Sequence, residues 1–219
     1  MRKTGWYELQ RLCLGFVVLI AGQILTPIAA AADAPSNIKT EVVALGQVLR
    51  GHFTQERQLA GFSKPLRSEG SFVLAPGLGL IWRGEKPFAN TTIISSDGIL
   101  QMVNGQPAMR LTASRLPGLS QLYEVLGAAV SGNIKPLQQT FATTQSSDDN
   151  GWRVVMKPLH PENAAMAQIK TLTLTGSRFV DSATIEKSGG DHDRITFAGQ
   201  QIVKADLTPE ERAQLKAAK

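Results

Sequence analysis

The sequence predicts an α+β fold in which helices cover one face of an antiparallel sheet. Between Gly70 and Leu111, apolar and polar side chains alternate with the period of two that strands have. Turn signals separate these runs at Pro76-Gly77, Asp97-Gly98 and Asn104-Gly105. Segments with helical apolar spacing precede and follow this meander, and further strands come after them. This order favours an antiparallel sheet over a parallel α/β fold.

The first 32 residues predict a cleaved secretory signal peptide. Basic residues up to Arg11 precede an apolar run over residues 12–25, and small residues follow up to Ala32. The run is shorter than the about 20 residues that cross a membrane, and a retained membrane anchor is the alternative. Cys13 lies early in the run rather than after it, which argues against an acylated lipoprotein. We expect a periplasmic protein that begins at Asp33.

Residues 33–219 predict one domain, large enough to bury a core. The chain has 23 basic and 18 acidic residues; residues 1–32 account for three basic and one acidic, so their removal lowers the net charge from +5 to +3. This charge is compatible with an anionic membrane or an acidic partner and decides neither. Cys13 is the single cysteine, so residues 33–219 offer no thiol or disulfide chemistry.

A first helix is expected over residues 38–49, followed by a strand from Phe53 to Leu59. Pro35-Ser36-Asn37 offers a start for this helix and Gly51 a stop. Its apolar residues at helical spacing are Ile38, Val42, Leu45 and Leu49.

A second helix is expected over residues 119–130. Its apolar stripe consists of Leu119, Leu122, Tyr123, Leu126, Ala129 and Val130. Gly127 weakens it by about 1 kcal/mol relative to alanine, and Gly118 and Gly132 bound it. Two interpretations remain open, a movable element over the sheet or a packed core helix.

The second half of the chain predicts a return to strands. Alternation over residues 152–157 and 171–175 is typical of half-buried strands, and residues 178–187 and 194–197 predict two more, joined by a glycine-containing turn. Thr208-Pro209-Glu210-Glu211 has the pattern of a capping box with proline at the first helical position, so it predicts a short C-terminal helix.

Six short motifs carry a family resemblance. In chain order they are Phe53-Thr54-Gln55, Gly70-x-Phe72, Pro76-Gly77, Trp82, Lys86-Pro87 and Asp97-Gly98. This ordered set resembles the LolA-type periplasmic carriers of outer-membrane lipoproteins, over most of residues 33–219 and more loosely beyond Gly98. The resemblance implies an open, incomplete antiparallel β-barrel, a strongly curved sheet whose concave face the helices cover.

The resemblance also implies a mechanism and partners. It implies a monomer without enzymatic activity that takes acylated cargo, a lipoprotein or another lipid, from an inner-membrane exporter to an outer-membrane acceptor. One position departs from the family pattern: Ala75 stands where the residue before the turn proline is usually an arginine that holds a helical lid closed. With alanine there, we expect the lid, residues 119–130, to rest more open or to be held by apolar packing alone.

Large apolar side chains on the predicted strands and on the second helix are the candidate lipid-binding residues. In the simplest interpretation most of them fill a core, and a subset lines a cavity for acyl chains; methionine suits such a site because it is flexible. The candidates are Phe72, Leu74, Leu80, Trp82, Leu100, Met102, Leu119, Leu122, Leu126, Trp152 and Met156.

Catalytic and metal-binding patterns are weak in this sequence. His52, His160 and His192 have no metal-ligand spacing to one another, and Asp191-His192-Asp193 lies where a polar turn is expected. No nucleophile elbow, phosphate loop or nucleic-acid-binding patch is present. We therefore expect a carrier that is not an enzyme, needs no cofactor or metal and binds no nucleic acid. The alternatives are a cell-envelope binding or structural module with a solid core, and a periplasmic hydrolase.

Overall fold

Eleven strands and two α-helices make up the described part of the chain in a computed structural model. The described residues are 38–115, 119–162, 166–204 and 206–218, and all belong to one compact unit, Asp33–Lys219. The strands are β1 (Val48–Gln58), β2 (Leu66–Ala75), β3 (Gly79–Lys86), β4 (Asn90–Ile94), β5 (Gly98–Val103), β6 (Gln106–Thr112), β7 (Phe141–Asp148), β8 (Gly151–Pro158), β9 (Ile169–Gly176), β10 (Val180–Lys187) and β11 (His192–Val203). The helices are α1 (Leu119–Ser131), a short 3₁₀ helix η1 (Lys135–Gln139) and α2 (Pro209–Ala217).

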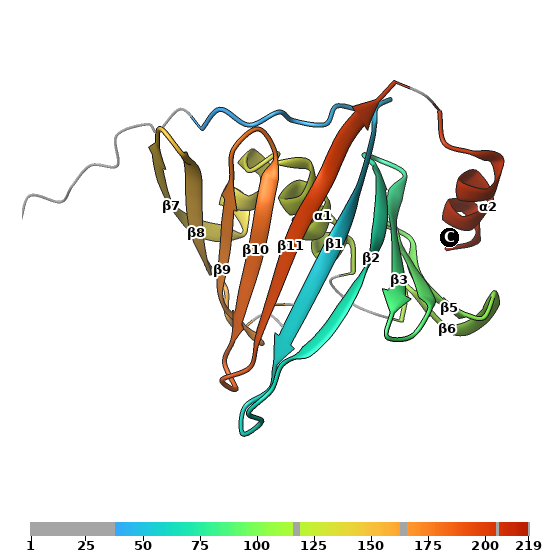
Figure 1. Ribbon diagram of the computed structural model, residues 1–219, viewed down its shortest axis with the longest axis horizontal. Helices are drawn as coiled ribbons and strands as arrows, with labels where there is room; N and C mark the ends of the chain where they lie inside the picture. Colours follow the sequence, from blue (N-terminus) through green and yellow to red (C-terminus); the bar gives the residue numbers. More distant parts are fainter. Residues whose placement is uncertain (1–37, 116–118, 163–165, 205, 219) are drawn as a thin grey trace, which may run out of the picture. The chain divides into compact units, whose positions relative to one another are not determined.

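The strands form one open antiparallel sheet, in the order β6-β5-β4-β3-β2-β1-β11-β10-β9-β8-β7 (Figure 1). The chain starts near the middle with β1 and meanders outward to β6 at one edge. It resumes with β7 at the other edge and meanders back to β11 beside β1. The segment that contains α1 must therefore cross from one edge of the sheet to the other. This connection confirms the predicted α+β class of open, curved sheet and explains why a helix covers one of its faces.

The hairpin turns form where turn residues predict them. Asn104 and Gly105 both have positive φ, 51° and 75°, and join Val103 to its β6 partner Gln106 in a two-residue turn. Two central residues with positive φ are the mark of a type I′ turn, whose twist matches that of the flanking strands. The Pro76-Gly77 turn joins β2 to β3, and its Gly77 also has positive φ, 79°. The predicted meander is therefore confirmed turn by turn.

Alternation along the strands sorts the apolar side chains onto two faces. On β2, Phe72 and Leu74 pack into one cluster, whereas Val73 and Ala75 between and after them pack into another. We call the first cluster, which includes Val125 and Ala129 of α1, the α1-side core, and the second, which includes Leu207 and Leu215 near and in α2, the α2-side core. In Figure 1, α1 lies behind the strands and α2 lies beside β3.

Helix α2 is fixed on its face by polar as well as apolar contacts. The Thr208 hydroxyl accepts a hydrogen bond from the Glu211 backbone N–H, 3.2 Å, and Glu211 Oε2 accepts one from the Thr208 N–H, 2.9 Å. The predicted capping box is thus confirmed. Arg50 of β1 also donates two hydrogen bonds to the Glu211 carboxylate, from Nη1 at 2.5 Å and from Nη2 at 2.8 Å. The prediction that helices share one face is wrong for α2, which packs on the face opposite to α1.

The helix predicted over residues 38–49 is absent from the structure. Residues 38–47 run without helix or strand along one end of the sheet, and Val48 already begins β1. The Glu41 N–H donates to Arg178 O at 2.7 Å, and the Val43 N–H donates to Ser131 O at 3.2 Å. Because these backbone groups have partners distant in sequence, the segment lies extended. Its helical apolar spacing was misleading, since Leu45 is 78% exposed.

Strand β7 was not expected, because its residues after Phe141 are polar and mostly exposed. It is an edge strand that pairs with β8 alone in the described part of the chain, so it needs no apolar alternation. The predicted signal peptide, residues 1–32, lies outside the described residues. None of the helices that the structure describes has the length and apolar character to cross a membrane.

Candidate functional site

The α1-side core gathers six of the candidate lipid-binding residues on one face. These six are Phe72, Leu74, Leu80, Trp82, Trp152 and Met156. They come from β2, β3 and β8, which lie on both sides of the sheet centre. All are buried except Trp82, which is half-buried and packs against the others. Strands far apart in sequence therefore build one continuous apolar face under α1.

The other candidates do not share that face. Leu100 is fully buried and Met102 half-buried in the α2-side core, on the face opposite to Phe72. Alternation correctly paired Leu100 with Met102 but does not tell which face of the sheet they meet. Leu119 is buried at the start of α1, outside both clusters, and Leu126 is half-buried. The side chain of Leu122 lies outside the described part.

An aromatic group occupies the centre of the α1 face. The Phe53 and Trp82 rings stack with centroids 3.8 Å apart, and Phe72 lies 6.0 Å from Trp82. Phe197 of β11 meets Phe72 edge to face at 5.4 Å and Trp82 at 6.3 Å. Stacked and edge-to-face pairs add about 0.5–1.5 kcal/mol each beyond the burial of their area. Four rings from β1, β2, β3 and β11 thus form a rigid apolar platform.

Two glycines make this platform possible. Gly70 of β2 lies between Phe53 of β1 and Gly84 of β3 in the strand register, so Phe53 and Trp82 can meet across β2. A Cβ on Gly70 would lie 1.9 Å from the Arg83 carbonyl oxygen, which rules out a larger residue without moving the backbone. A Cβ on Gly51 would lie 2.8 Å from the Phe72 ring that covers it. Packing therefore explains the Gly70-x-Phe72 motif: Gly70 leaves room for the backbone of β3, and Phe72 covers Gly51.

Three hydrogen bonds hold helix α1 at one end of the sheet, two of them to turns and one to the segment before β1. The Ser120 hydroxyl donates to Ser96 O at 3.3 Å, and the Val43 N–H donates to Ser131 O at 3.2 Å. Between them, the Tyr123 hydroxyl accepts a hydrogen bond from the Gly77 backbone N–H. Burial raises the pKa of Tyr123, and the Gly77 hydrogen bond offsets part of that rise. The phenol is therefore neutral at physiological pH.

These contacts correct the expectation about Ala75. The Ala75 side chain is buried in the α2-side core, so an arginine there would point away from α1. The turn that follows Ala75 still holds the helix, but through the backbone of Gly77 and a side chain of α1 itself. Packing alone therefore does not describe how α1 is held. Tyr123 was assigned to the apolar stripe by its spacing, which gives no sign of its hydroxyl partner.

Two pockets, each of about 310 Å³, lie near α1: the first is lined in part by α1 itself and the second by the segment that follows it. The first lies between the Pro76-Gly77 turn, residues 42–45 and the α1 residues Tyr123, Glu124, Gly127 and Ala128. The second lies between residues 38–42 and the segment from Gly132 to Gln138. Gly127 faces open space, because a Cβ there would have no atom within 4 Å. The α1 face is thus a packed core with small openings beside the helix.

An ion-pair cluster borders the α1 face toward the β1–β2 and β10–β11 turns. Asp193 is 4% exposed and accepts from Arg57 Nε at 2.6 Å, while Lys187 Nζ lies 2.7 Å from its other oxygen. Burial raises the pKa of Asp193, but the bonds from Lys187 and Arg57 outweigh it and keep that pKa below its ordinary value. The residues Asp191, His192 and Asp193 therefore do not form one site, because Asp193 is buried and His192 is exposed.

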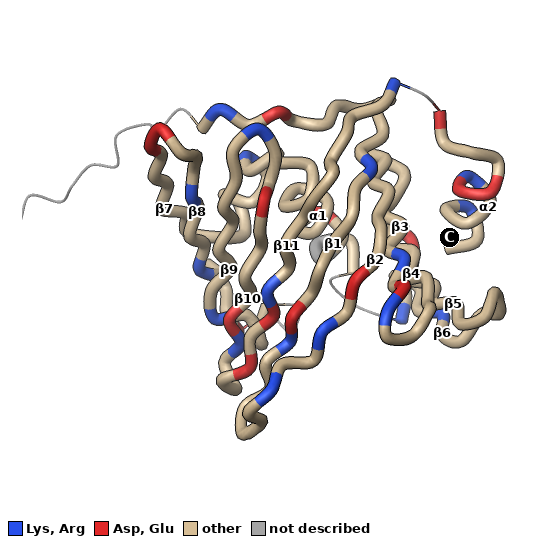
Figure 2. Tube along the Cα trace, viewed as in Figure 1, with Lys and Arg blue, Asp and Glu red and all other residues tan. Residues whose placement is uncertain are grey.

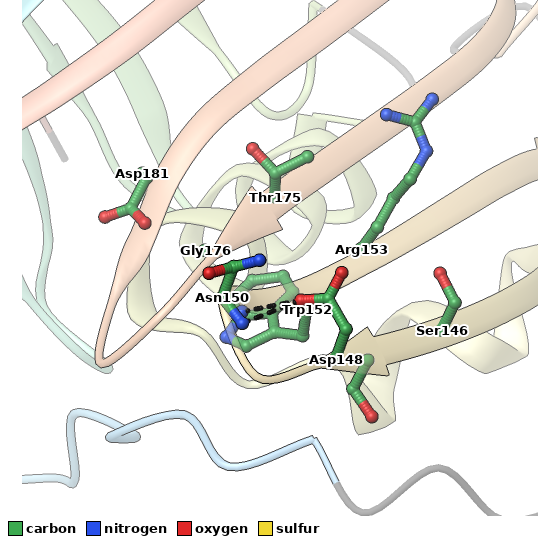
Figure 3. Close-up of a pocket in the computed structure, with 10 residues that line it drawn as sticks. Ser146, Asp148, Asn150, Trp152, Arg153, Thr175, Gly176 and Asp181 are labelled. Carbon is green, nitrogen blue, oxygen red and sulfur yellow. Dashed lines mark hydrogen bonds between the residues drawn. The ribbon is translucent and has the colours of Figure 1, made fainter.

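A further pocket of about 400 Å³ lies around the β7–β8 turn, and Trp152 of the α1-side core is one of the residues that line it (Figure 3). Asp148 accepts backbone hydrogen bonds from Asn150 and Gly151, at 2.8 and 3.1 Å, which close the β7–β8 turn. Arg153 and Asp181 line the rim. No group of three or more histidine, cysteine or carboxylate side chains able to hold a metal occurs within the described ranges. Apart from Trp152 and two glycines, the residues that line the pocket are polar or charged.

Sequence reasoning missed two members of the platform as site residues. Phe53 was placed on a strand, and Phe197 at the end of another, without a role in binding. Their register partners could not be known, because Phe53 pairs with Phe197 across β1 and β11, which are more than 130 residues apart in sequence by their numbers.

Comparisons with known proteins identify a matching family and similar solved structures. Residues 28–217 match the model of a family described as outer membrane lipoprotein carrier protein LolA-like. The crystal structure of LolA superfamily protein NE2245 from Nitrosomonas europaea is similar at 8% identity and a TM-score of 0.40, over 78% of this chain and 91% of that chain. LprF from Mycobacterium bovis is similar at 12% identity and a TM-score of 0.32, over 74% and 88%. No curated protein matches the chain.

Proposed function

We propose, because this chain belongs to the LolA-like family of outer membrane lipoprotein carriers, that it carries acylated cargo through the periplasm between the inner and outer membranes. The cargo is a lipoprotein or another lipid, an inner-membrane exporter is the donor, and an outer-membrane protein is the acceptor. The protein acts as a monomer after its signal peptide is removed. Its work is binding and release, with no catalysis and no cofactor.

The observation that carries the proposal is the one-sided aromatic platform under a crossing helix. An acyl chain gains about 0.8 kcal/mol per buried methylene group, so a 16-carbon chain gains roughly 12 kcal/mol before the costs of binding. The platform formed by Phe53, Phe72, Trp82 and Phe197 offers such a chain an apolar surface without buried charge. α1 has the same kind of surface toward the sheet, namely Val125, Ala128, Ala129 and Val130.

Binding requires α1 to move. Each pocket beside the helix, about 310 Å³, lies at the small end of the about 300–1,000 Å³ that ligand sites occupy. A long acyl chain therefore enters by displacing part of α1 from the platform, and its methylene groups replace the helix contacts. The described conformation is then the closed, unloaded form. The exchange of one apolar partner for another keeps the cost of opening low.

Native mass spectrometry of the protein purified gently from its own cells tests the proposal. We expect a population heavier than the polypeptide by the mass of an acylated molecule, and uptake of a fluorescent fatty acyl probe by the unloaded protein. A protein that carries no lipid in cells and takes up no probe contradicts the proposal. That outcome would instead identify an envelope module with a solid core.

A further inference from the structure

The β1–β2 turn exposes large apolar side chains at one end of the sheet. Phe62 is 67% exposed and Leu66, at the start of β2, is 61% exposed. Residues 59–65 join β1 to β2 near the centre of the sheet. In Figure 1 this turn extends beyond the neighbouring turns. Single exposed apolar residues are common on proteins, but here one lies in a projecting turn and another directly beside it, which is the pattern of an interaction site.

The turn is held in shape by hydrogen bonds. The Phe62 N–H donates to Leu59 O at 3.1 Å, and the Gln58 side-chain amide donates to the Phe62 carbonyl oxygen. The Ala60 N–H donates to Asp191 Oδ1 at 2.8 Å, which ties the turn to the adjacent β10–β11 turn. The exposure of Phe62 is therefore a property of an ordered turn.

The charges around these side chains favour an anionic partner. Residues 57–68 contain three basic residues, Arg57, Lys64 and Arg67, and no acidic residue. The Arg57 charge is engaged by Asp193, and Asp191 bonds the backbone of the turn. Arg67 lies 4.0 Å from Glu69, and its side chain is 63% exposed. Lys64 and Arg67 thus add positive charge close in sequence to Phe62, at an end of the sheet where Figure 2 shows both basic and acidic residues.

We propose that this turn docks the protein on an anionic lipid surface. Phe62 and Leu66 enter the interface between head groups and acyl chains, and Lys64 and Arg67 bind the negatively charged head groups. A bilayer fits better than a protein partner, because the apolar groups project from a tip rather than line a groove. The proposal goes beyond lipid carriage, since docking by the turn does not depend on what α1 covers.

Vesicle binding tests the proposal with the protein produced from its full coding sequence and purified from the soluble fraction. We expect it to float with vesicles that contain phosphatidylglycerol. Replacing Phe62 and Leu66 together by serine should weaken this binding by about tenfold or more. Replacing Lys64 and Arg67 together by glutamine should weaken it by about fivefold per charge and leave binding to pure phosphatidylcholine unchanged.

Met109→Ser is the matched control, because Met109 is 41% exposed on β6 at one edge of the sheet, away from the β1–β2 turn. It should bind vesicles like the unmodified protein, and all variants should melt at the same temperature. The same variants should take up a soluble fatty acyl probe normally, so a failure of docking is distinguishable from a failure of carriage. The proposal is overturned if the unmodified protein ignores anionic vesicles or if the Phe62 and Leu66 variant binds them equally well.

Discussion

The two faces of the sheet hold their helices in different ways. α1 contains one charged residue, Glu124, which is exposed. It meets the sheet through apolar side chains and is held by three hydrogen bonds, two to turns and one to Val43. α2 inserts the carboxylate of Glu211, 4% exposed, between Arg50 and Arg83 of the sheet. In the proposed function a lipid chain replaces the first attachment, whereas nothing in a lipid replaces the second.

Physical chemistry explains why the difference matters. An acyl chain makes the same kind of apolar contact with the platform as α1 does. When α1 moves away, contacts with the cargo therefore replace the contacts that the platform loses, which keeps the free energy of opening low. A buried carboxylate separated from its guanidinium partner finds no substitute in a lipid, and the loss costs several kcal/mol. Under the proposed function, one face of the sheet therefore stays fixed and the other is exchangeable.

Removing the ion pair that holds α2 should have the largest effect on the free energy of unfolding. Arg50→Met leaves Glu211 buried without its bidentate partner, so the free energy of unfolding should fall by about 3–5 kcal/mol. Denaturant titration measures the change. Arg178→Met is the control, because Arg178 pairs with Glu41 on the surface, where its side chain is 72% exposed, and its loss should cost about 1 kcal/mol or less. Equal losses in the two variants would remove the distinction between the faces.

Truncations on the two faces should separate stability from binding. Trp82→Ala and Leu215→Ala each remove apolar contacts and should lower the free energy of unfolding by about 2–4 kcal/mol. Affinity for a fluorescent fatty acyl probe should fall in the Trp82 variant and stay unchanged in the folded Leu215 variant. Binding that weakens equally in both would mean that the platform has no special role.

Acid should loosen the α2 face. The hydrogen bonds from Arg50 outweigh burial and lower the pKa of Glu211 from its ordinary 4.5 to about 2. A carboxylate with a lowered pKa stabilises the folded state above pH 4.5, and this contribution is lost as the pH falls toward 2. Between pH 5 and pH 3 the loss amounts to about 2 kcal/mol. Comparing the unfolding free energy of Glu211→Gln with that of the unmodified protein isolates it; parallel pH curves would contradict the assignment.

The Tyr123 hydroxyl should have the smallest effect. Tyr123→Phe removes the hydrogen bond from Gly77 and keeps the ring, so it should cost about 1 kcal/mol. If α1 opens to admit cargo, the variant should take up the acyl probe severalfold faster. Ser114→Ala, which removes a hydroxyl bonded to Thr112 on the exposed end of β6, is a control that should leave uptake unchanged. An unaltered uptake rate in Tyr123→Phe would mean that this contact does not restrain the helix.

Local chemistry made most of the fold predictable. Asn104-Gly105 and the capping box at Thr208 depend on residues adjacent in sequence, and both form as expected. The extended segment before β1 was mistaken for a helix, because its backbone partners at Ser131 and Arg178 are far away in the chain. Distance in sequence is the common cause of such errors.

The site was predictable only in part, for the same reason. Alternation shows that Phe72 and Leu74 share a face, and that Leu100 and Met102 share one, but only long-range packing decides that these faces are opposite. The Tyr123 contact with Gly77 likewise joins a helix to a turn that precedes it by four strands.

Photocrosslinking with a fatty acid that carries a photoreactive group in its acyl chain tests the central claim most directly. The crosslinked protein is digested, and the modified residues are located by mass spectrometry. The account predicts modification of α1 and of the platform residues Phe53, Phe72, Trp82 and Phe197, and no modification of α2. Crosslinks that fall on α2 and on Leu100 or Met102, or that scatter over the surface, would contradict it.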